Sequence, residues 1–133
     1  MGSKSDVYEV DVLKATTGQA TTILTTTPIT PWIALFTTAP TDSTGGTEVT
    51  GGSYARTTSA AKWATPAAGS VATNAAVTFP TASASWGTVT SFAVMTASSG
   101  GSILMWGTLT TSKAVGSGDT PSFASGALTL TED

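Results

Sequence analysis

The chain contains no histidine and no cysteine, and only 10% of its 133 residues are charged. The absence of cysteine excludes disulfides, thiolate metal sites and thiol redox chemistry. The absence of histidine removes the commonest general base. From Trp63 to Ser112, fifty consecutive residues carry no charged side chain at all. Because side-chain catalysis nearly always needs a group that ionises or binds a metal, this composition argues against an enzyme and favours a protein that acts through its surface.

Basic charge and long apolar runs are also scarce. Five lysines and arginines stand against eight aspartates and glutamates, a formal net charge of −3, whereas a nucleic-acid-binding surface needs clustered basic residues. The densest apolar run, 102–109, is far shorter than the roughly 20 residues that span a bilayer. Residues 1–14 alternate charged and apolar side chains, unlike a secretory signal. We therefore expect no direct binding to nucleic acid and no membrane segment.

The chain does have enough apolar surface to fold. Its hydrophobic content is 40%, which can offset the entropy lost on ordering. A length of 133 residues fits one domain that folds without a disulfide or a metal. We predict a single domain over 1–133, in which 1–30 form an N-terminal arm, or a helix and linker, and 31–133 form the body of a β-sandwich.

Short β-type segments separated by Gly, Pro, Ser and Asp make up most of the chain. Segment 31–38 is bounded by prolines and apolar on both faces at its centre, which places it inside the domain. Segment 71–79 has the period of two of a half-buried strand. These features predict an all-β fold, an antiparallel β-sandwich of jelly-roll or Ig-like type, with a polar loop over 39–53 and a Gly-containing hairpin link over 98–101. The expected strands are 31–38, 54–63, 71–79, 87–97, 103–110 and 122–131.

The N-terminal segment fits two kinds of element. Asp6 and Glu9 have the spacing of a helix capping pair, and Val7, Val10 and Leu13 could line one helical face. Segment 8–12 also alternates apolar and acidic residues, as a strand does. In either case Gly18 is expected to end the element.

Several segments resemble, in order, those of small structural proteins of tailed bacteriophages, which are often labelled tail-fibre or virion proteins. The most characteristic runs from Gly46 to Arg56 and reads Gly-Thr-Glu-Val-Thr-Gly-Gly-Ser-Tyr-Ala-Arg. The other matching segments are 32–42, 77–90, 107–113 and 118–123. In such relatives the N-terminal segment is a short helix before a turn, so the resemblance favours a short N-terminal helix here.

The resemblance implies a component of the virion, assembled in the cytoplasm of the bacterial host. Our hypothesis is a non-enzymatic capsid decoration, or cement, protein that binds the major capsid protein, forms a homo-oligomer, most simply a trimer, and needs no cofactor. Burial of neutral surface between subunits would stabilise the assembly, because Thr, Ser, Ala and Gly cost less to desolvate than charged groups. The loop over 39–53 and the N-terminal segment are the expected contact elements.

Three alternatives remain open. The first is a tail-fibre or tail-tip component with tail proteins as partners. The second is a receptor- or glycan-binding module, in which Trp86, the aromatic expected to be exposed, would stack on the ligand. The third is an enzyme that uses carboxylates for glycoside hydrolysis or a Ca²⁺ site; its candidate residues are Asp42, Glu48 and Asp119.

Each candidate also has an ordinary interpretation, which we favour. Gly45-Gly46 and Gly51-Gly52 are not followed by the Lys-Ser/Thr of a phosphate-binding loop and indicate turns. Acidic residues in loops usually form turns. A Ser–Lys nucleophile built on Lys62 or Lys113 has no supporting motif. We predict no catalytic, cofactor-binding or metal-binding residue.

The aromatic residues are expected to serve the core or subunit contacts rather than to bind sugars. Trp106 lies in a run that is apolar on both faces, so either its strand is central or something outside the domain covers one face. Arg56 is expected to pair with Glu48 across the Gly51-Gly52 turn and so to hold that loop. The aromatics considered are Tyr8, Trp32, Tyr54, Trp63, Trp86 and Trp106.

Overall fold

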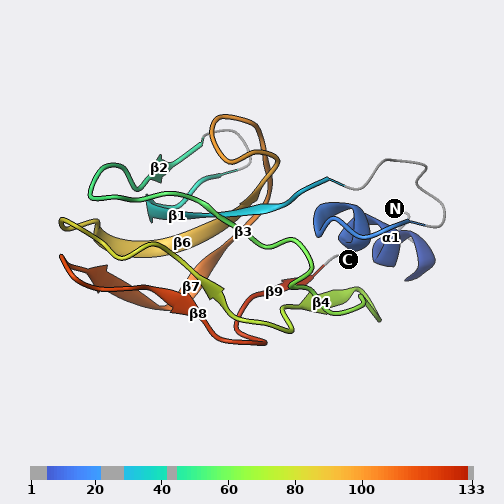
Figure 1. Ribbon diagram of the computed structural model, residues 1–133. Coiled ribbons are helices and arrows are strands. Elements are labelled where there is room, and N and C mark those ends of the chain that lie inside the picture. The colour runs from blue at the N-terminus through green and yellow to red at the C-terminus, as the bar shows by residue number, and fades with distance from the viewer. Residues whose placement is uncertain (1–5, 22–28, 42–44, 132–133) are drawn as a thin grey trace.

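A computed structural model describes residues 6–21, 29–41 and 45–131. Within these residues the chain forms one helix followed by short and long antiparallel strands (Figure 1). The elements are α1 (Asp6–Thr16), β1 (Trp32–Thr38), β2 (Thr47–Glu48), β3 (Thr57–Thr58), β4 (Ser70–Ala72), β5 (Val77–Thr78), β6 (Gly87–Met95), β7 (Ile103–Val115), β8 (Ser122–Phe123) and β9 (Thr129–Thr131). The predicted all-β sandwich and its short N-terminal helix are confirmed. No helix within the described residues is long and apolar enough to cross a membrane.

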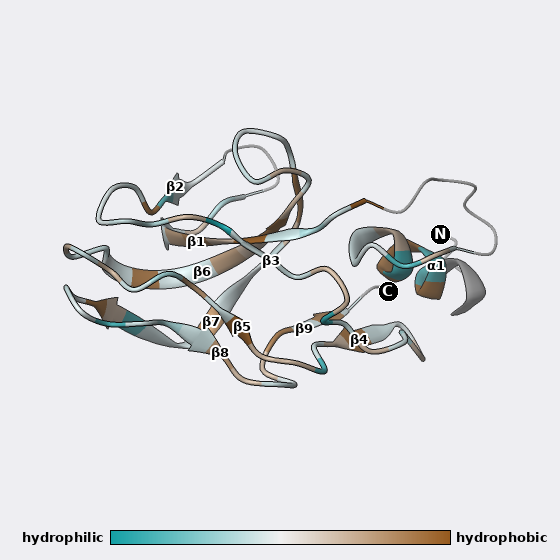
Figure 2. Ribbon diagram, in the orientation of Figure 1, coloured by the Kyte–Doolittle hydropathy of each residue, from teal (hydrophilic) through white to brown (hydrophobic). Residues whose placement is uncertain are grey.

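The main sheet is built around β1. Its strand order is β2-β1-β6-β7, and β3 also pairs with β1. Because β1 is apolar on both faces, Ile33 and Leu35 enter the large core while Ala34 and Phe36 enter a smaller cluster on the opposite face. Figure 2 shows brown, hydrophobic segments along both β1 and its neighbour β6. The prediction that 31–38 lies inside the domain is therefore confirmed.

The second layer consists of two short ladders, β4-β9 and β5-β8. The period of two predicted over 71–79 is present in the burial, because Val71, Thr73, Val77 and Phe79 are all buried. One continuous strand is nevertheless wrong: the chain turns between Thr73 and Ala76 and gives one strand to each ladder. Segment 122–131 divides in the same way into β8 and β9. The alternation of buried and exposed side chains is thus kept even where the strand hydrogen bonding is interrupted.

Other expected boundaries also need correction. Most of 54–63 is irregular, and only β3 pairs there, apart from an isolated bridge between Trp63 and Thr73. The loop over 39–53 contains β2. The last strand of the main sheet extends beyond the predicted 103–110 and ends at Val115. The Thr-rich residues after Leu109 give a weak strand signal, which pairing with β6 overrides. The small residues of 54–63 form a ladder only at β3.

Helix α1 is joined to the sandwich through its buried face. Leu13 is 0% exposed and belongs to the large core. Gly18 then ends the segment with φ of 74°, and a Cβ there would lie 2.5 Å from the Ile29 carbonyl oxygen. The Gln19 side-chain amide donates to the Ala64 carbonyl at 3.0 Å. Helix α1 is therefore part of the packed molecule beside β4 and β9 (Figure 1).

Candidate functional site

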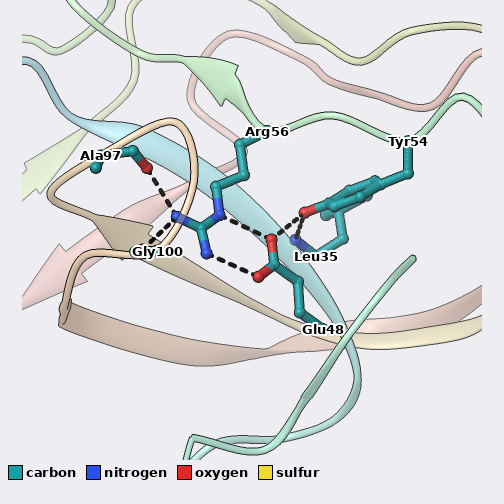
Figure 3. A network of polar contacts seen from close by, with 6 residues as sticks. All are labelled: Leu35, Glu48, Tyr54, Arg56, Ala97 and Gly100. Atoms are coloured by element: carbon teal, nitrogen blue, oxygen red, sulfur yellow. Dashed lines mark hydrogen bonds and ion pairs between the residues drawn. The ribbon is translucent and has the colours of Figure 1, made fainter. Parts of the chain in front are cut away.

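The strongest polar cluster links β2 to the segment before β3. Glu48 ends β2, and Arg56 directly precedes β3. The Arg56 Nε donates to Glu48 Oε1 at 2.8 Å, and its Nη2 donates to Oε2 at 2.8 Å (Figure 3). The side chains are only 8% and 24% exposed, respectively. The predicted pair is confirmed, and it has the two-bond geometry that makes Arg–carboxylate pairs specific.

The same arginine also holds a distant loop. Its Nη1 donates to the carbonyl oxygens of Ala97 and Gly100, each at 2.8 Å, so that the link between β6 and β7 is drawn toward β2. On the other side, the Tyr54 hydroxyl donates to Glu48 Oε1 at 2.8 Å and accepts from the Leu35 amide at 3.0 Å. We call Glu48, Tyr54 and Arg56, with these backbone partners, the Arg56 clasp (Figure 3).

The electrostatics of the clasp favour a fixed ion pair beside a neutral phenol. Burial opposes ionisation of Glu48, but hydrogen bonds from Arg56 and Tyr54, with the charge of Arg56, outweigh it and lower the pKa of Glu48. Burial raises the pKa of Tyr54, and the neighbouring Glu48 raises it further. The hydrogen bonds to Glu48 raise the pKa of Arg56 against the effect of burial. No proton is poised for transfer near neutral pH, so the clasp is suited to holding three segments together.

Of the other candidate carboxylates, Asp119 does not join Glu48 in this network. Asp119 is exposed, and its Oδ2 accepts from the Gly116 amide at 2.8 Å, which is the geometry of a turn. Asp42 lies outside the described residues. Within the described residues, no group of three or more acidic side chains could hold a metal ion.

The glycine pair beside the clasp forms a tight turn. Gly52 has φ of 57°, and a Cβ there would lie 2.8 Å from the Ala84 carbonyl oxygen. Its own carbonyl accepts from Trp86 Nε1 at 2.8 Å. The Gly51-Gly52 signal is therefore structural.

The prediction that Trp86 is the exposed aromatic is wrong. Trp86 is 4% exposed and packs edge-to-face against Tyr54, with ring centroids 5.3 Å apart. Gly52 approaches the indole ring closely because it has no side chain: a Cβ there would lie 3.0 Å from Trp86 Nε1. Trp63 is buried too and donates to Ser59 Oγ at 3.0 Å. Trp32 is half-buried, and the side chain of Tyr8 lies outside the described part of the structure.

The exposed aromatic is Trp106, on the opposite edge of the main sheet. Within the described residues β7 pairs only with β6, so its outer edge is unpaired. Leu104 and Trp106 are 40% and 38% exposed, and no other large hydrophobic side chain of the described residues is as open. The sequence signal was the run apolar on both faces, but only the strand order shows which residues it leaves uncovered.

A pocket of about 400 Å³ lies beside the same strand. Between the pairs Val89–Lys113 and Ser91–Thr108, β6 has only Thr90, whereas β7 has 109–112. This wide bulge bends β7 away from β6. The pocket opens there, between β7 and the segment that carries β8; its apolar lining includes Phe92, Leu109, Val115, Phe123 and Leu128.

Comparison with known proteins gives one finding. A family model described as "Podophage GP4 fiber I protein gp80" matches residues 3–131. A search of the curated proteins returns no match. The matched range contains both the Arg56 clasp and the open edge of β7.

Proposed function

The chain belongs to the podophage GP4 fiber I protein gp80 family, and from this premise we propose that it is a subunit of a fibre on the particle of a tailed phage. It is a structural component of the virion, as the sequence resemblance implied. The observation that carries the fibre proposal is the match of the family model over residues 3–131. The protein then works by position and contact and not by turnover of a substrate.

The surface chemistry supports a role in assembly. The fifty residues from Trp63 to Ser112 carry no charge, and they include β6 and most of β7. Neutral side chains can be buried against another protein without the desolvation cost of unpaired charges. Leu104 and Trp106 add large apolar side chains to this neutral surface, and aromatic residues are common anchors of protein interfaces.

Its partners are other virion components. We propose that the chain associates with further copies of itself, with a trimer as the expectation from the resemblance, and with tail proteins. We also propose that 1–133 acts as one domain: Leu13 of α1 is buried in the same cluster as Val71 and Leu130 of the second layer, which supports this. The N-terminal helix is then available for contacts only through its outer face.

The capsid decoration predicted from the sequence, with the major capsid protein as partner, is the principal alternative within the virion. The same neutral surface would serve it, but the family description favours a fibre. The glycan-binding alternative loses its proposed residue, because Trp86 is buried. The hydrolase alternative loses its cluster, because Glu48 and Asp119 have separate structural partners.

Copy number and position on purified particles test this function. We expect quantitative mass spectrometry to find a few to tens of copies per virion, and cryo-electron microscopy to place their density on the tail. The major capsid protein in the same sample provides the internal standard. Hundreds of copies distributed over the shell would replace the fibre with capsid decoration, and the absence of the protein from particles would reject both.

A further inference from the structure

We propose that the pocket between β7 and β8 binds a small anion with an apolar body, such as a medium-chain carboxylate. The pocket measures about 400 Å³, within the roughly 300–1,000 Å³ that is usual for ligand pockets. Its lining has the composition of such pockets, because most of the side chains are apolar and a few polar groups stand among them. The site belongs to the single chain, so the proposal does not depend on where in the virion the protein lies.

The apolar part of the pocket is formed by the large core itself. Leu35 of β1, Phe92 of β6 and Leu128 line it, and each is at most 6% exposed. Phe123 of β8 lines it too and is half-buried. Its ring packs edge-to-face against Phe92, with centroids 6.2 Å apart. A hydrocarbon body bound here would extend the core and would gain from the removal of apolar surface from water.

The wide bulge in β7 keeps this space open. The bulge at 109–112 bends β7 away from β6, and Leu109, the first residue of the bulge, is only partly buried against the core. Thr110 and Thr111, which also belong to the bulge, are exposed and line the pocket. Because β7 pairs with β6 on both sides of the bulge, the path of the backbone at the pocket is fixed by the sheet.

Charge complementarity selects the kind of ligand. Among the described residues that line the pocket, Lys113 is the one that carries a charge. It lies opposite Val89 in the β6–β7 ladder, and opposite residues of an antiparallel pair lie on the same face of the sheet. Val89 belongs to the large core, so Lys113 projects from the core side of β7. Asp119, the nearest acidic residue in sequence, accepts from the Gly116 amide instead and does not line the pocket.

Lys113 also has an ordinary role that needs no ligand. A charged residue on the inner face of an edge strand protects that edge from pairing with another chain. The two roles respond differently to the sign of the charge. Protection needs a charge of either sign, whereas recognition of an anion needs a positive one. A change of sign at position 113 therefore separates them.

Two ligands of equal chain length test the proposal. Decanoate and decylammonium have the same hydrocarbon body and opposite charges, and NMR titration of the full chain, below the micelle concentration, measures a dissociation constant for each. For decanoate we expect one saturable site with a dissociation constant of about 1 mM or lower. We expect decylammonium to bind at least about tenfold more weakly, because it forms no charge-assisted hydrogen bond with Lys113. The methyl signals of Leu109 and Leu128 should shift, and the indole signal of Trp106 should not.

Three variants show which residue recognises the charge. Lys113→Glu should invert the preference, so that decylammonium binds more tightly than decanoate. Lys62→Glu makes the same change of net charge at a residue that does not line the pocket, and should keep the preference for decanoate. Ala127 is exposed and lines the pocket, so Ala127→Trp should fill the space and weaken both ligands by about tenfold or more. Unfolding midpoints without ligand show whether each variant keeps the fold.

Several outcomes would overturn the proposal. Equal affinity for the two ligands would mean that only the hydrocarbon is bound, and equal effects of Lys62→Glu and Lys113→Glu would mean a response to net charge. Shifts confined to Leu104 and Trp106 would place the ligand on the outer apolar surface, and the absence of saturable decanoate binding at millimolar concentration would remove the site. Because copy number per virion tests the fibre proposal separately, loss of this site would leave that proposal standing, and the reverse also holds.

Discussion

The two edges of the main sheet use charge in opposite ways. At the β2–β3 edge, Glu48 and Arg56 neutralise one another, and the remaining donors of Arg56 are taken up by the carbonyls of the β6–β7 link. At the β7 edge, no charge occurs before Lys113, and Leu104 and Trp106 are open. The difference teaches that one edge uses its charged pair to hold segments of the same chain together, while the other edge leaves large apolar side chains open.

The largest expected difference between the two edges is in stability. It is measured by removing Trp86, which packs against Tyr54 of the Arg56 clasp, and Trp106 on β7. Trp86→Ala should lower the free energy of unfolding by about 3–5 kcal/mol, because it leaves a cavity beside Tyr54 in the large core. Trp106→Ala should change it by less than about 1 kcal/mol, since that side chain is exposed in the isolated chain. Urea unfolding followed by fluorescence measures both. Similar losses for the two variants would remove the distinction between a closed and an open edge.

Breaking the ion pair tests whether the clasp is structural. Arg56→Met should cost about 2–3 kcal/mol of unfolding free energy, because it leaves Glu48 and two carbonyl groups without their donor in a partly buried site. Lys113→Met, a matched change on the exposed part of β7, should cost less than about 0.5 kcal/mol. Equal costs for the two substitutions would mean that the Arg56 pair contributes no more than a surface charge.

The phenol of the clasp should contribute less than the arginine. Tyr54→Phe removes the donor to Glu48 and leaves the Leu35 amide without its acceptor, a loss of about 1–3 kcal/mol. A double-mutant cycle with Glu48→Gln should show coupling between the two changes, since both residues belong to one network. Strict additivity in that cycle would contradict the hydrogen bond between Tyr54 and Glu48.

The smallest expected effect is a pH dependence of the unfolding free energy that comes from Glu48. Because the pKa of Glu48 is lowered on folding from 4.5, its contribution is present above that pH and is lost as the pH falls through the folded-state value. Unfolding free energies measured from pH 7 to pH 3 should therefore decline more for the unchanged protein than for Glu48→Gln. Lys113→Met should leave the decline unaltered. Parallel curves for the unchanged protein and Glu48→Gln would contradict the lowered pKa.

Much of the fold is predictable because side-chain pattern reports burial. The proline-bounded apolar run gave β1, the alternation over 71–79 gave its buried positions, and Gly18 gave the end of α1. The same pattern does not report hydrogen-bond ladders. It therefore missed the turn between Thr73 and Ala76 and the extension of the last main-sheet strand to Val115.

The site was predictable only where its residues lie close in sequence. Glu48 and Arg56 are separated by a short glycine turn, so their pairing could be inferred. The contacts of Arg56 with Ala97 and Gly100 join remote segments through backbone carbonyls. Because every residue has such a carbonyl, the sequence does not reveal which residues accept these bonds. The prediction for Trp86 was wrong, and the two alternatives for Trp106 stayed open, for a related reason: exposure depends on which strand ends the sheet, and local composition does not reveal the strand order.

The pairing of β1 with β6 has a consequence for how the chain is made. Trp32 lies opposite Met95, and Ser70 lies opposite Thr131. In each layer, therefore, the first strand pairs with a strand that is synthesised much later. Folds dominated by such distant pairings form slowly, on the order of milliseconds to seconds. During synthesis β1 emerges first and remains without its central neighbour while a long charge-free stretch follows it. The apolar side chains of β1 that face β6 in the folded protein therefore stay uncovered until β6 has been synthesised.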